Sequence, residues 1–292
     1  MKNLLEIQNL NKTYRNFALR DVSFTLPEGC ITGFIGPNGA GKTTVLKTIL
    51  GLTPKDSGVI RFFGRDEDAA SRSVRERLGV VFDSGGFYEE LSLMEMKSLA
   101  AAAYPSWDEQ EFCRLLERFS LNPRQKIRTL SKGMRMKYSL ALALSHRAEL
   151  LIMDEPTSGL DPLIRRQLLD TLREYMERGG RGVFFSTHIT SDLDRLADML
   201  ILIDHGKIVF QEDKDSLLER YRIVKGDLRA LNDSVLPLLS NLSRTAFGFT
   251  AVTDRPEEIR RAMPDALLER ASIDDIMLSN IEGGKNYAAF AD

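Results

Sequence analysis

The chain consists mostly of short apolar runs that alternate with helical segments, followed by a more mixed region. Apolar runs and alternating apolar positions predict buried or half-buried strands. Helical periodicity fills most of the intervals between the later runs, and from about 88 to 148 it replaces the strands. The strands are expected at 5–14, 22–26, 30–35, 59–63, 79–82, 150–153, 183–185 and 199–203, and the helices at 45–50, 135–144, 162–178 and 190–197. The pattern predicts an α/β fold with a mainly parallel sheet.

Three further regions complete the expected organisation. The first two strands predict an N-terminal antiparallel β subdomain, and Ser106-x-x-Glu109 predicts a capping box at the start of a helix in the helical insert. Asp204 to Lys207 predicts a tight turn between two strands. After about Tyr221 the chain is expected to contain mixed short segments, such as 250–253 and a helix at 256–263. We therefore divide the chain into a domain at 1–220, with a helical subdomain at about 88–148, and a small α/β accessory domain at 221–292.

Composition narrows the class of protein. The 292 residues are 43% hydrophobic and 28% charged, with a formal net charge of −2. The hydrophobic content is sufficient for a sizeable core. The nearly balanced charge lacks the excess of basic residues that is typical of nucleic-acid-binding proteins, so no nucleic-acid partner is expected. The two cysteines have no metal-ligand spacing, and no uninterrupted apolar stretch approaches 18 residues.

A glycine-rich segment between a predicted strand and a predicted helix carries the strongest chemical signal. Its G-x-x-x-x-G-K-[S/T] pattern is typical of a loop that binds nucleotide phosphates through backbone N–H groups and a helix N-terminus. Lys42 would reach the β- and γ-phosphates, and Thr43 would place its hydroxyl on Mg²⁺. The expected nucleotide-binding residues of this loop are Gly36, Pro37, Asn38, Gly39, Ala40, Gly41, Lys42, Thr43 and Thr44. The fold class is therefore a P-loop NTPase core.

Two carboxylates follow the apolar strand at 150–153. Asp154 and Glu155 end this strand, and a buried parallel strand that ends in acids places them at a ligand site. Asp154 would hold Mg²⁺ through its water shell, and Glu155 would polarise the water that attacks the γ-phosphate. The alternative interpretation is an acidic pair that only stabilises the next helix N-terminus.

Residues 1 to about 220 resemble the ATP-binding subunit of an ATP-binding cassette (ABC) transporter. Leu130-Ser131-Lys132-Gly133-Met134 is similar to that family's signature, Leu-Ser-Gly-Gly-Gln, and Ser158-Gly159-Leu160-Asp161 is similar to its dimer-contact loop. His188 resembles the family's switch histidine and Tyr14 its adenine-stacking aromatic residue. The resemblance implies that Lys42, Glu155 and His188 are catalytic and that Tyr14, Ser131, Gly133 and Asp161 contact nucleotide.

The chain departs from the family pattern at three positions. Lys132 and Met134 replace the usual Gly and Gln of the signature, whereas Ser131 and Gly133 are retained. Asp83 stands where the family places a Gln that contacts Mg²⁺ and the attacking water. The Asp side chain is one methylene shorter than that of Gln, and its carboxylate accepts hydrogen bonds without donating them. It could still reach the metal or the nucleotide.

The resemblance further implies an ATPase that uses ATP and Mg²⁺ and acts as a homodimer. Each ATP would lie between the phosphate loop of one copy and Ser131 and Gly133 of the other. A separate membrane permease would dock at a groove near residues 87–94 and export a substrate such as an antibiotic or peptide. The chain would be cytoplasmic and peripheral on the inner face of the membrane. The alternatives are a non-transport ABC ATPase in translation or DNA maintenance, and a weakly hydrolysing ATP-binding regulator.

Overall fold

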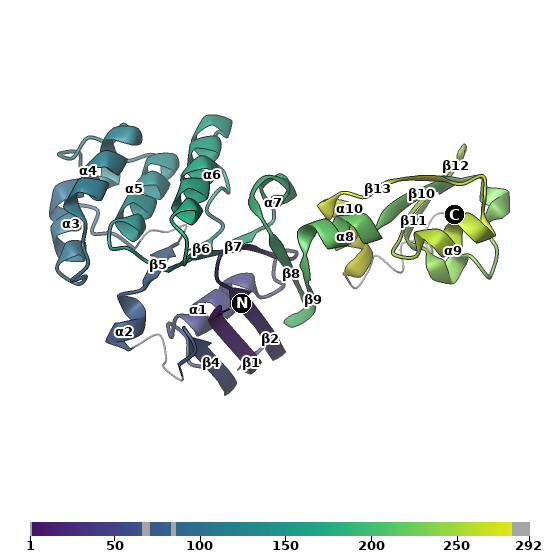
Figure 1. Cartoon of the computed structure of the whole chain (residues 1–292), viewed down its shortest axis with the longest axis horizontal. Helices are drawn as coiled ribbons and strands as arrows, with labels where there is room; N and C mark the ends of the chain where they lie inside the picture. Colours follow the sequence, from purple (N-terminus) through teal and green to yellow (C-terminus); the bar gives the residue numbers. More distant parts are fainter. Residues whose placement is uncertain (1, 66–70, 83–85, 282–292) are drawn as a thin grey trace.

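The computed structural model describes residues 2–65, 71–82 and 86–281, and its centre is a six-stranded sheet (Figure 1). The strand order is β5-β6-β7-β3-β8-β9, and each neighbouring pair is parallel except β8 and β9. This order confirms the α/β class and the mainly parallel sheet. The strands are β3 (Ile31–Ile35), β5 (Leu78–Val81), β6 (Leu150–Asp154), β7 (Gly182–Thr187), β8 (Met199–Asp204) and β9 (Lys207–Asp213).

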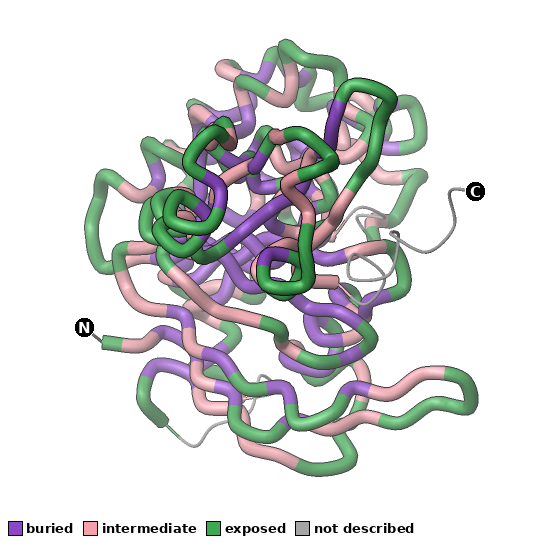
Figure 2. Tube along the Cα trace, turned by 90° about the vertical axis from the view of Figure 1, so that its right-hand side faces the viewer, coloured by how far each residue is buried: buried purple, intermediate pink, exposed green. Residues whose placement is uncertain are grey.

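Alternate side chains of the central strands enter two different cores. In β6, Leu150 and Ile152 belong to one hydrophobic cluster, whereas Leu151 and Met153 belong to the other. This division follows from the two-residue period of a strand, and it explains why the run is apolar at every position. Figure 2 shows that the buried parts of the chain are concentrated in the interior of the molecule.

One face of the sheet is covered by an antiparallel β subdomain and the first helix. The subdomain has strand order β2-β1-β4, with β1 (Asn3–Tyr14) pairing antiparallel to both neighbours, β2 (Phe17–Pro27) and β4 (Ser57–Phe62). Helix α1 (Lys42–Ile49) buries Val45, Leu46 and Ile49 in the same cluster as these strands. Both the predicted subdomain and the predicted helix are confirmed.

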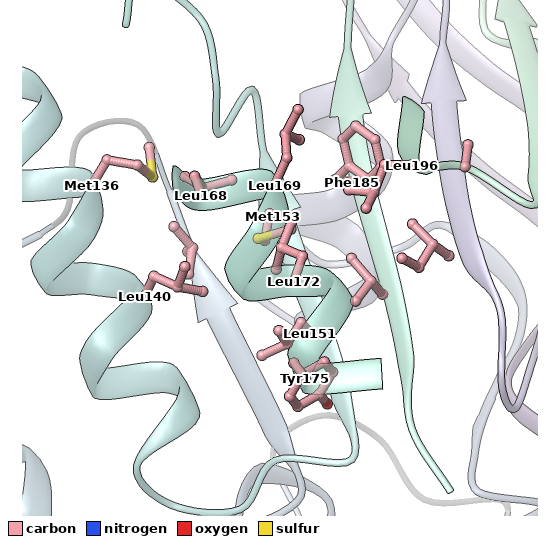
Figure 3. Packing of buried hydrophobic residues seen from close by; sticks show 14 of the residues in the cluster. Met136, Leu140, Leu151, Met153, Leu168, Leu169, Leu172, Tyr175, Phe185 and Leu196 are labelled. Carbon is pink, nitrogen blue, oxygen red and sulfur yellow. The ribbon is translucent and has the colours of Figure 1, made fainter. Parts of the chain in front are cut away.

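The opposite face is covered by the helices of the insert and the two helices after β6. Figure 3 shows Leu168, Leu169, Leu172 and Tyr175 packed between Leu140 of the insert and the strands. These helices are α3 (Leu93–Ala101), α4 (Glu109–Arg118), α5 (Lys132–Leu144), α6 (Pro162–Glu177) and α7 (Thr190–Leu196), while the short α2 (Arg72–Arg75) precedes β5.

The predicted capping box at Ser106 is wrong. Helix α4 begins one residue after Asp108, whose side chain accepts a hydrogen bond from the Glu111 N–H. Ser106 instead donates to the carbonyl of His146 at 2.7 Å, and Glu109 accepts from Trp107 Nε1. An aspartate three residues before the required N–H satisfies the helix start just as well, and the sequence pattern did not distinguish the two.

A two-residue turn joins β8 to β9 as predicted. Asp204 pairs with Lys207, and the two residues between them, His205 and Gly206, both have positive φ angles, 44° and 75°. Positive φ at both central positions is the geometry of a type I′ hairpin turn, and Gly accepts it without strain.

The C-terminal region has its own antiparallel sheet, with order β11-β12-β10-β13. Its last helix, α10 (Ile273–Asn280), nevertheless buries Ile273 and Ile276 in the large core that also contains Leu193 of α7. The elements of this region are α8 (Lys214–Arg220), β10 (Arg222–Gly226), β11 (Ser240–Thr245), β12 (Gly248–Thr253), α9 (Pro256–Ala262) and β13 (Leu267–Arg270). Among the described residues, no helix is both long and apolar enough to cross a membrane.

Candidate functional site

The glycine-rich loop lies between the carboxyl end of β3 and the N-terminus of α1. Gly41 is the N-cap of α1 with a φ of 111°, a conformation that L side chains rarely adopt. A Cβ atom at Gly36 would lie 2.2 Å from the Ile203 carbonyl oxygen. Since no side chain caps α1, its first N–H groups are available to an anion, as the motif predicts.

The Lys42 ammonium lies over this loop and faces an acid. Its Nζ donates to the Gly36 carbonyl at 2.7 Å and lies 3.8 Å from Glu155 Oε1. Burial lowers the pKa of Lys42, while the negative charges of Glu155 and Asp154 oppose that change. The ammonium is therefore a buried cation in the place where phosphate charge would gather.

Asp154 is held through both of its carboxylate oxygens. Thr43 Oγ1 donates to Oδ2 at 2.9 Å, and Ser186 Oγ donates to Oδ1 at 2.6 Å. A carboxylate beside a threonine hydroxyl is the hard-oxygen pair that Mg²⁺ prefers when phosphates supply further ligands. Across the described ranges, no cluster of three or more His, Cys, Asp or Glu side chains could hold a metal alone. The site fits a metal that arrives with a nucleotide.

Glu155 lies between the buried lysine and the predicted switch histidine. Its Oε2 is 2.7 Å from His188 Nδ1, and its backbone has a φ of 49°, in the left-handed region. A non-glycine residue in this region is uncommon and occurs frequently at functional sites. A carboxylate held in this way can accept a proton from an attacking water, and His188 can contact the same reacting group.

Lys42, Thr43 and Glu155 line a pocket of about 620 Å³, which is within the size range of small-molecule sites. Tyr14 is 44% exposed, and Lys12 Nζ lies 5.6 Å from the centroid of its ring. The lining residues are Tyr14, Asn16, Phe17, Asn38, Gly39, Gly41, Lys42, Thr43, Thr44 and Glu155. The structure therefore brings Tyr14 to the pocket that contains the phosphate loop.

The signature and the dimer-contact loop do not line this pocket. Ser131 caps α5, and its Oγ accepts from the Met134 N–H at 3.3 Å. Asp161 caps α6 by accepting from the N–H groups of Leu163 and Ile164. A Cβ atom at Gly133 would lie 2.6 Å from Ile164 Cδ1, so this glycine also permits close helix packing. Asp83 lies outside the described residues.

Two polar residues near the site, Ser186 and Asp192, were not identified from the sequence. Ser186 contacts both Asp154 and the Glu155 backbone. The fully buried Asp192 accepts from Thr157 Oγ1 and from Arg165 Nε, and it thereby joins the segment after β6 to α6 and α7. A polar residue at the end of an apolar strand was the available signal for Ser186. No local pattern marks Asp192, because its partners are 27 and 35 residues away.

Comparisons with known proteins agree with this geometry. The family model described as ABC transporter matches residues 19–158. Lantibiotic transport ATP-binding protein SrtF of Streptococcus pyogenes is 34% identical over 216 residues, covering 73% of this chain and 92% of its own. Nod factor export ATP-binding protein I of Rhizobium sp. (strain N33) is 30% identical over 292 residues, covering 94% and 95%.

A solved structure described as an ATP-binding subunit of an ABC transporter superposes with a TM-score of 0.67. It is 33% identical and covers 74% of this chain and 92% of its own. These matches favour a transporter ATPase over the translation, DNA-maintenance and regulator alternatives. The chain belongs to the ABC transporter family of ATP-binding proteins, and it is an ATP-binding, ATP-hydrolysing subunit of that family.

Proposed function

We propose that this chain drives export through a separate membrane permease, as a homodimer on the cytoplasmic face of the membrane. Binding of ATP would close the dimer, and hydrolysis would open it again. The names of the relatives, lantibiotic transport and Nod factor export, support export, and we infer an antibiotic- or peptide-like substrate. Because selectivity would reside in the permease, the chain supplies the energy and not the recognition of the substrate.

The arrangement of Glu155 carries the proposal for hydrolysis. Its carboxylate lies between Lys42 Nζ and His188 Nδ1, next to Asp154. In this place it would accept the proton of the attacking water while Lys42 and the α1 N-terminus hold the phosphates. Asp154 and Thr43 would hold Mg²⁺, which, when bound, offsets phosphate charge. Asp83, which the sequence also assigns to the metal, stays a candidate for contact with it.

The positions of Ser131 and Gly133 support a site shared by two copies. Both belong to the start of α5 and do not line the pocket of their own chain. A two-fold pair would bring this helix start and the Asp161 loop of one copy to the phosphates held by the other. The γ-phosphate would then stabilise the closed pair, because ADP lacks the group that both copies contact.

A cavity on the helical insert is the proposed place for the permease. It has a volume of about 250 Å³ and is lined by residues that include Phe82, Phe87, Ala100 and Tyr104. Tyr88 follows Phe87 in the chain and Leu99 precedes Ala100, and these two residues are 68% and 53% exposed. An apolar surface with large exposed side chains fits an amphipathic helix of a partner.

The substitution Glu155→Gln tests the catalytic part of the proposal. The amide keeps the shape but cannot accept the proton, so turnover should fall by about 100-fold or more. ATP binding should persist, and the variant should accumulate an ATP-bound dimer, measured by size exclusion with and without ATP and Mg²⁺. A variant that hydrolyses ATP at the wild-type rate would refute the role of Glu155.

Charge substitutions test the permease surface separately. Tyr88→Glu and Leu99→Glu should each reduce co-purification with the membrane subunit while leaving the ATPase activity of the isolated chain unchanged. Leu52→Glu is the matched control, because this leucine is 63% exposed but lies after α1 rather than on the insert. Equal co-purification by all three variants would contradict the proposed docking surface.

A further inference from the structure

Ser186, at the end of β7, contacts both of the acids that end β6. Its Oγ donates to Asp154 Oδ1 at 2.6 Å and accepts from the Glu155 backbone N–H at 2.9 Å. The same N–H also lies 3.2 Å from the Ser186 carbonyl oxygen. The side chain is fully buried, so water does not compete for either contact. The Ser186 hydroxyl thus donates to the carboxylate of Asp154 and accepts from the backbone N–H of Glu155.

The contact with Asp154 completes the pairing of that carboxylate. Thr43 holds Oδ2 from the phosphate loop, and Ser186 holds Oδ1 from the neighbouring strand. The two strands are in register at this point, with Asp154 directly opposite Ser186. Without the Ser186 hydroxyl, a buried carboxylate oxygen would lose its partner and the carboxylate could rotate.

The contact with Glu155 holds an unusual backbone conformation. Glu155 has a φ of 49°, and its N–H points to Ser186 as the chain leaves β6. Such a conformation is retained only when surrounding contacts determine it. The direction in which the Glu155 side chain leaves the strand, toward Lys42 and His188, therefore depends on the contacts with Ser186, of which the hydroxyl makes the shorter.

We infer that Ser186 is a positioning residue for ATP hydrolysis, which sets the metal-holding acid and the water-activating acid relative to each other. This inference rests on the proposed roles of Asp154 and Glu155. The Ser186 side chain is fully buried and does not line the pocket. It acts by fixing the rotation of the Asp154 carboxylate beside Thr43 and the backbone direction of Glu155, whose side chain lines the pocket.

The substitution Ser186→Ala tests this inference by removing both contacts. We expect kcat to fall about 10- to 100-fold, as for the loss of other partners of metal-binding groups, with a change of less than about threefold in KM for ATP. The Mg²⁺ concentration for half-maximal activity should rise about tenfold, because Asp154 is no longer fixed.

A binding measurement separates positioning from general damage. Calorimetric ATP affinity with a chelator present should match wild type, whereas the gain in affinity on adding Mg²⁺ should shrink about tenfold. Ser145→Ala is the matched control, since Ser145 is also fully buried and donates only to a backbone carbonyl, at 2.6 Å from Ala141 O. If both serine variants give the same Mg²⁺ dependence, the inference is wrong.

The variant Ser186→Cys distinguishes hydrogen bonding from packing. A thiol fills nearly the same volume but is a weak donor and acceptor, so it should behave like alanine. Wild-type turnover and Mg²⁺ dependence in this variant would show that volume alone matters and would overturn the inference. Glu155→Gln separates a failure of the proposed function from a failure of this inference. If Glu155→Gln stays active, the proposed function fails. If Glu155→Gln is inactive and the Ser186 variants are normal, only the inference about Ser186 fails.

Discussion

The phosphate pocket and the signature segment differ in how their polar groups are satisfied. In the pocket, Lys42 and Asp154 are buried and each has partners within the same chain. At the start of α5, Ser131 and Lys132 are exposed, and the Ser131 hydroxyl only caps its own helix. The phosphate pocket is built within one chain, whereas the signature segment lies at the surface, where the proposed second copy would contact it. The predictions below test this division.

The largest effect is expected for Lys42→Ala. Loss of the buried ammonium should weaken ATP binding by about 100-fold or more, since a charge-assisted contact with phosphate disappears. Lys47→Ala is the matched control, because Lys47 lies on the same helix but is exposed. Equal ATP affinities of the two variants, measured by calorimetry, would exclude the assigned phosphate loop.

A large effect of a different kind is expected for Ser131→Arg. The bulky cation should obstruct the proposed contact between copies and reduce turnover by about 100-fold, while ATP affinity of the monomer changes less than about twofold. Ser92→Arg is the control for the lost helix cap, because Ser92 caps α3 through a capping box. If Ser131→Arg weakens ATP binding of the monomer as strongly as Lys42→Ala, the signature belongs to the same chain's pocket.

A smaller effect is expected for Tyr14→Ala. Loss of stacking on a base costs about 1–3 kcal/mol, and because Tyr14 is 44% exposed we expect the lower end, roughly a tenfold loss of affinity. Tyr14→Phe keeps the stacking face and should bind ATP like wild type. Alanine and phenylalanine variants of equal affinity would show that Tyr14 does not stack on the base.

The smallest effect is expected for the stability of the folded chain in acid, and it arises at His146, just after the helix that begins at the signature. Burial lowers the pKa of His146 to about 4, so the unfolded chain binds a proton below pH 6.5 that the folded chain excludes. Stability is therefore complete above pH 6.5 and falls as the pH drops toward 4, by about 1 kcal/mol at pH 5.5. Chemical denaturation at pH 7.5 and 5.5 measures the loss, which should be absent in His146→Gln.

Hydrogen exchange would locate that acid effect. His146 follows the end of α5 and stacks on Tyr104 with ring centroids 3.8 Å apart, so local opening should begin at α5 and not at α1. Earlier loss of protection in α1 at pH 5.5 would contradict the separation of the two regions.

The sequence predicted the parts of the site that follow from local patterns. The phosphate loop, with Lys42 and Thr43, depends on a strand, glycines and a helix that are adjacent in the chain. Asp154 and Glu155 follow an apolar run, and parallel strands bring their carboxyl ends to one edge of the sheet. These features needed no knowledge of distant contacts, and the structure places all four residues together.

The sequence did not predict features that depend on partners far along the chain. Ser186 pairs with Asp154 across 32 positions, and the clash that Gly133 avoids involves Ile164 of another helix. The sequence also did not predict that Ile273 and Ile276 pack in the large core beside α7. The C-terminal region was therefore expected to be a separate domain, although its last helix packs against the first one. The prediction of a capping box at Ser106 failed for a local reason. Ser106 and Asp108 are both good N-cap residues, and the sequence does not show which of them begins the helix.

Mixing two inactive variants tests the shared site most directly. Lys42→Ala keeps an intact signature, and Ser131→Arg keeps an intact pocket, so a mixed dimer has one complete site. If the copies pair at random, half of the dimers are mixed, and turnover should recover to about a quarter of wild type. Recovery above the sum of the separate variants is the predicted result. Turnover equal to that sum, in a mixture shown to contain mixed dimers, would contradict a pocket completed by a second copy.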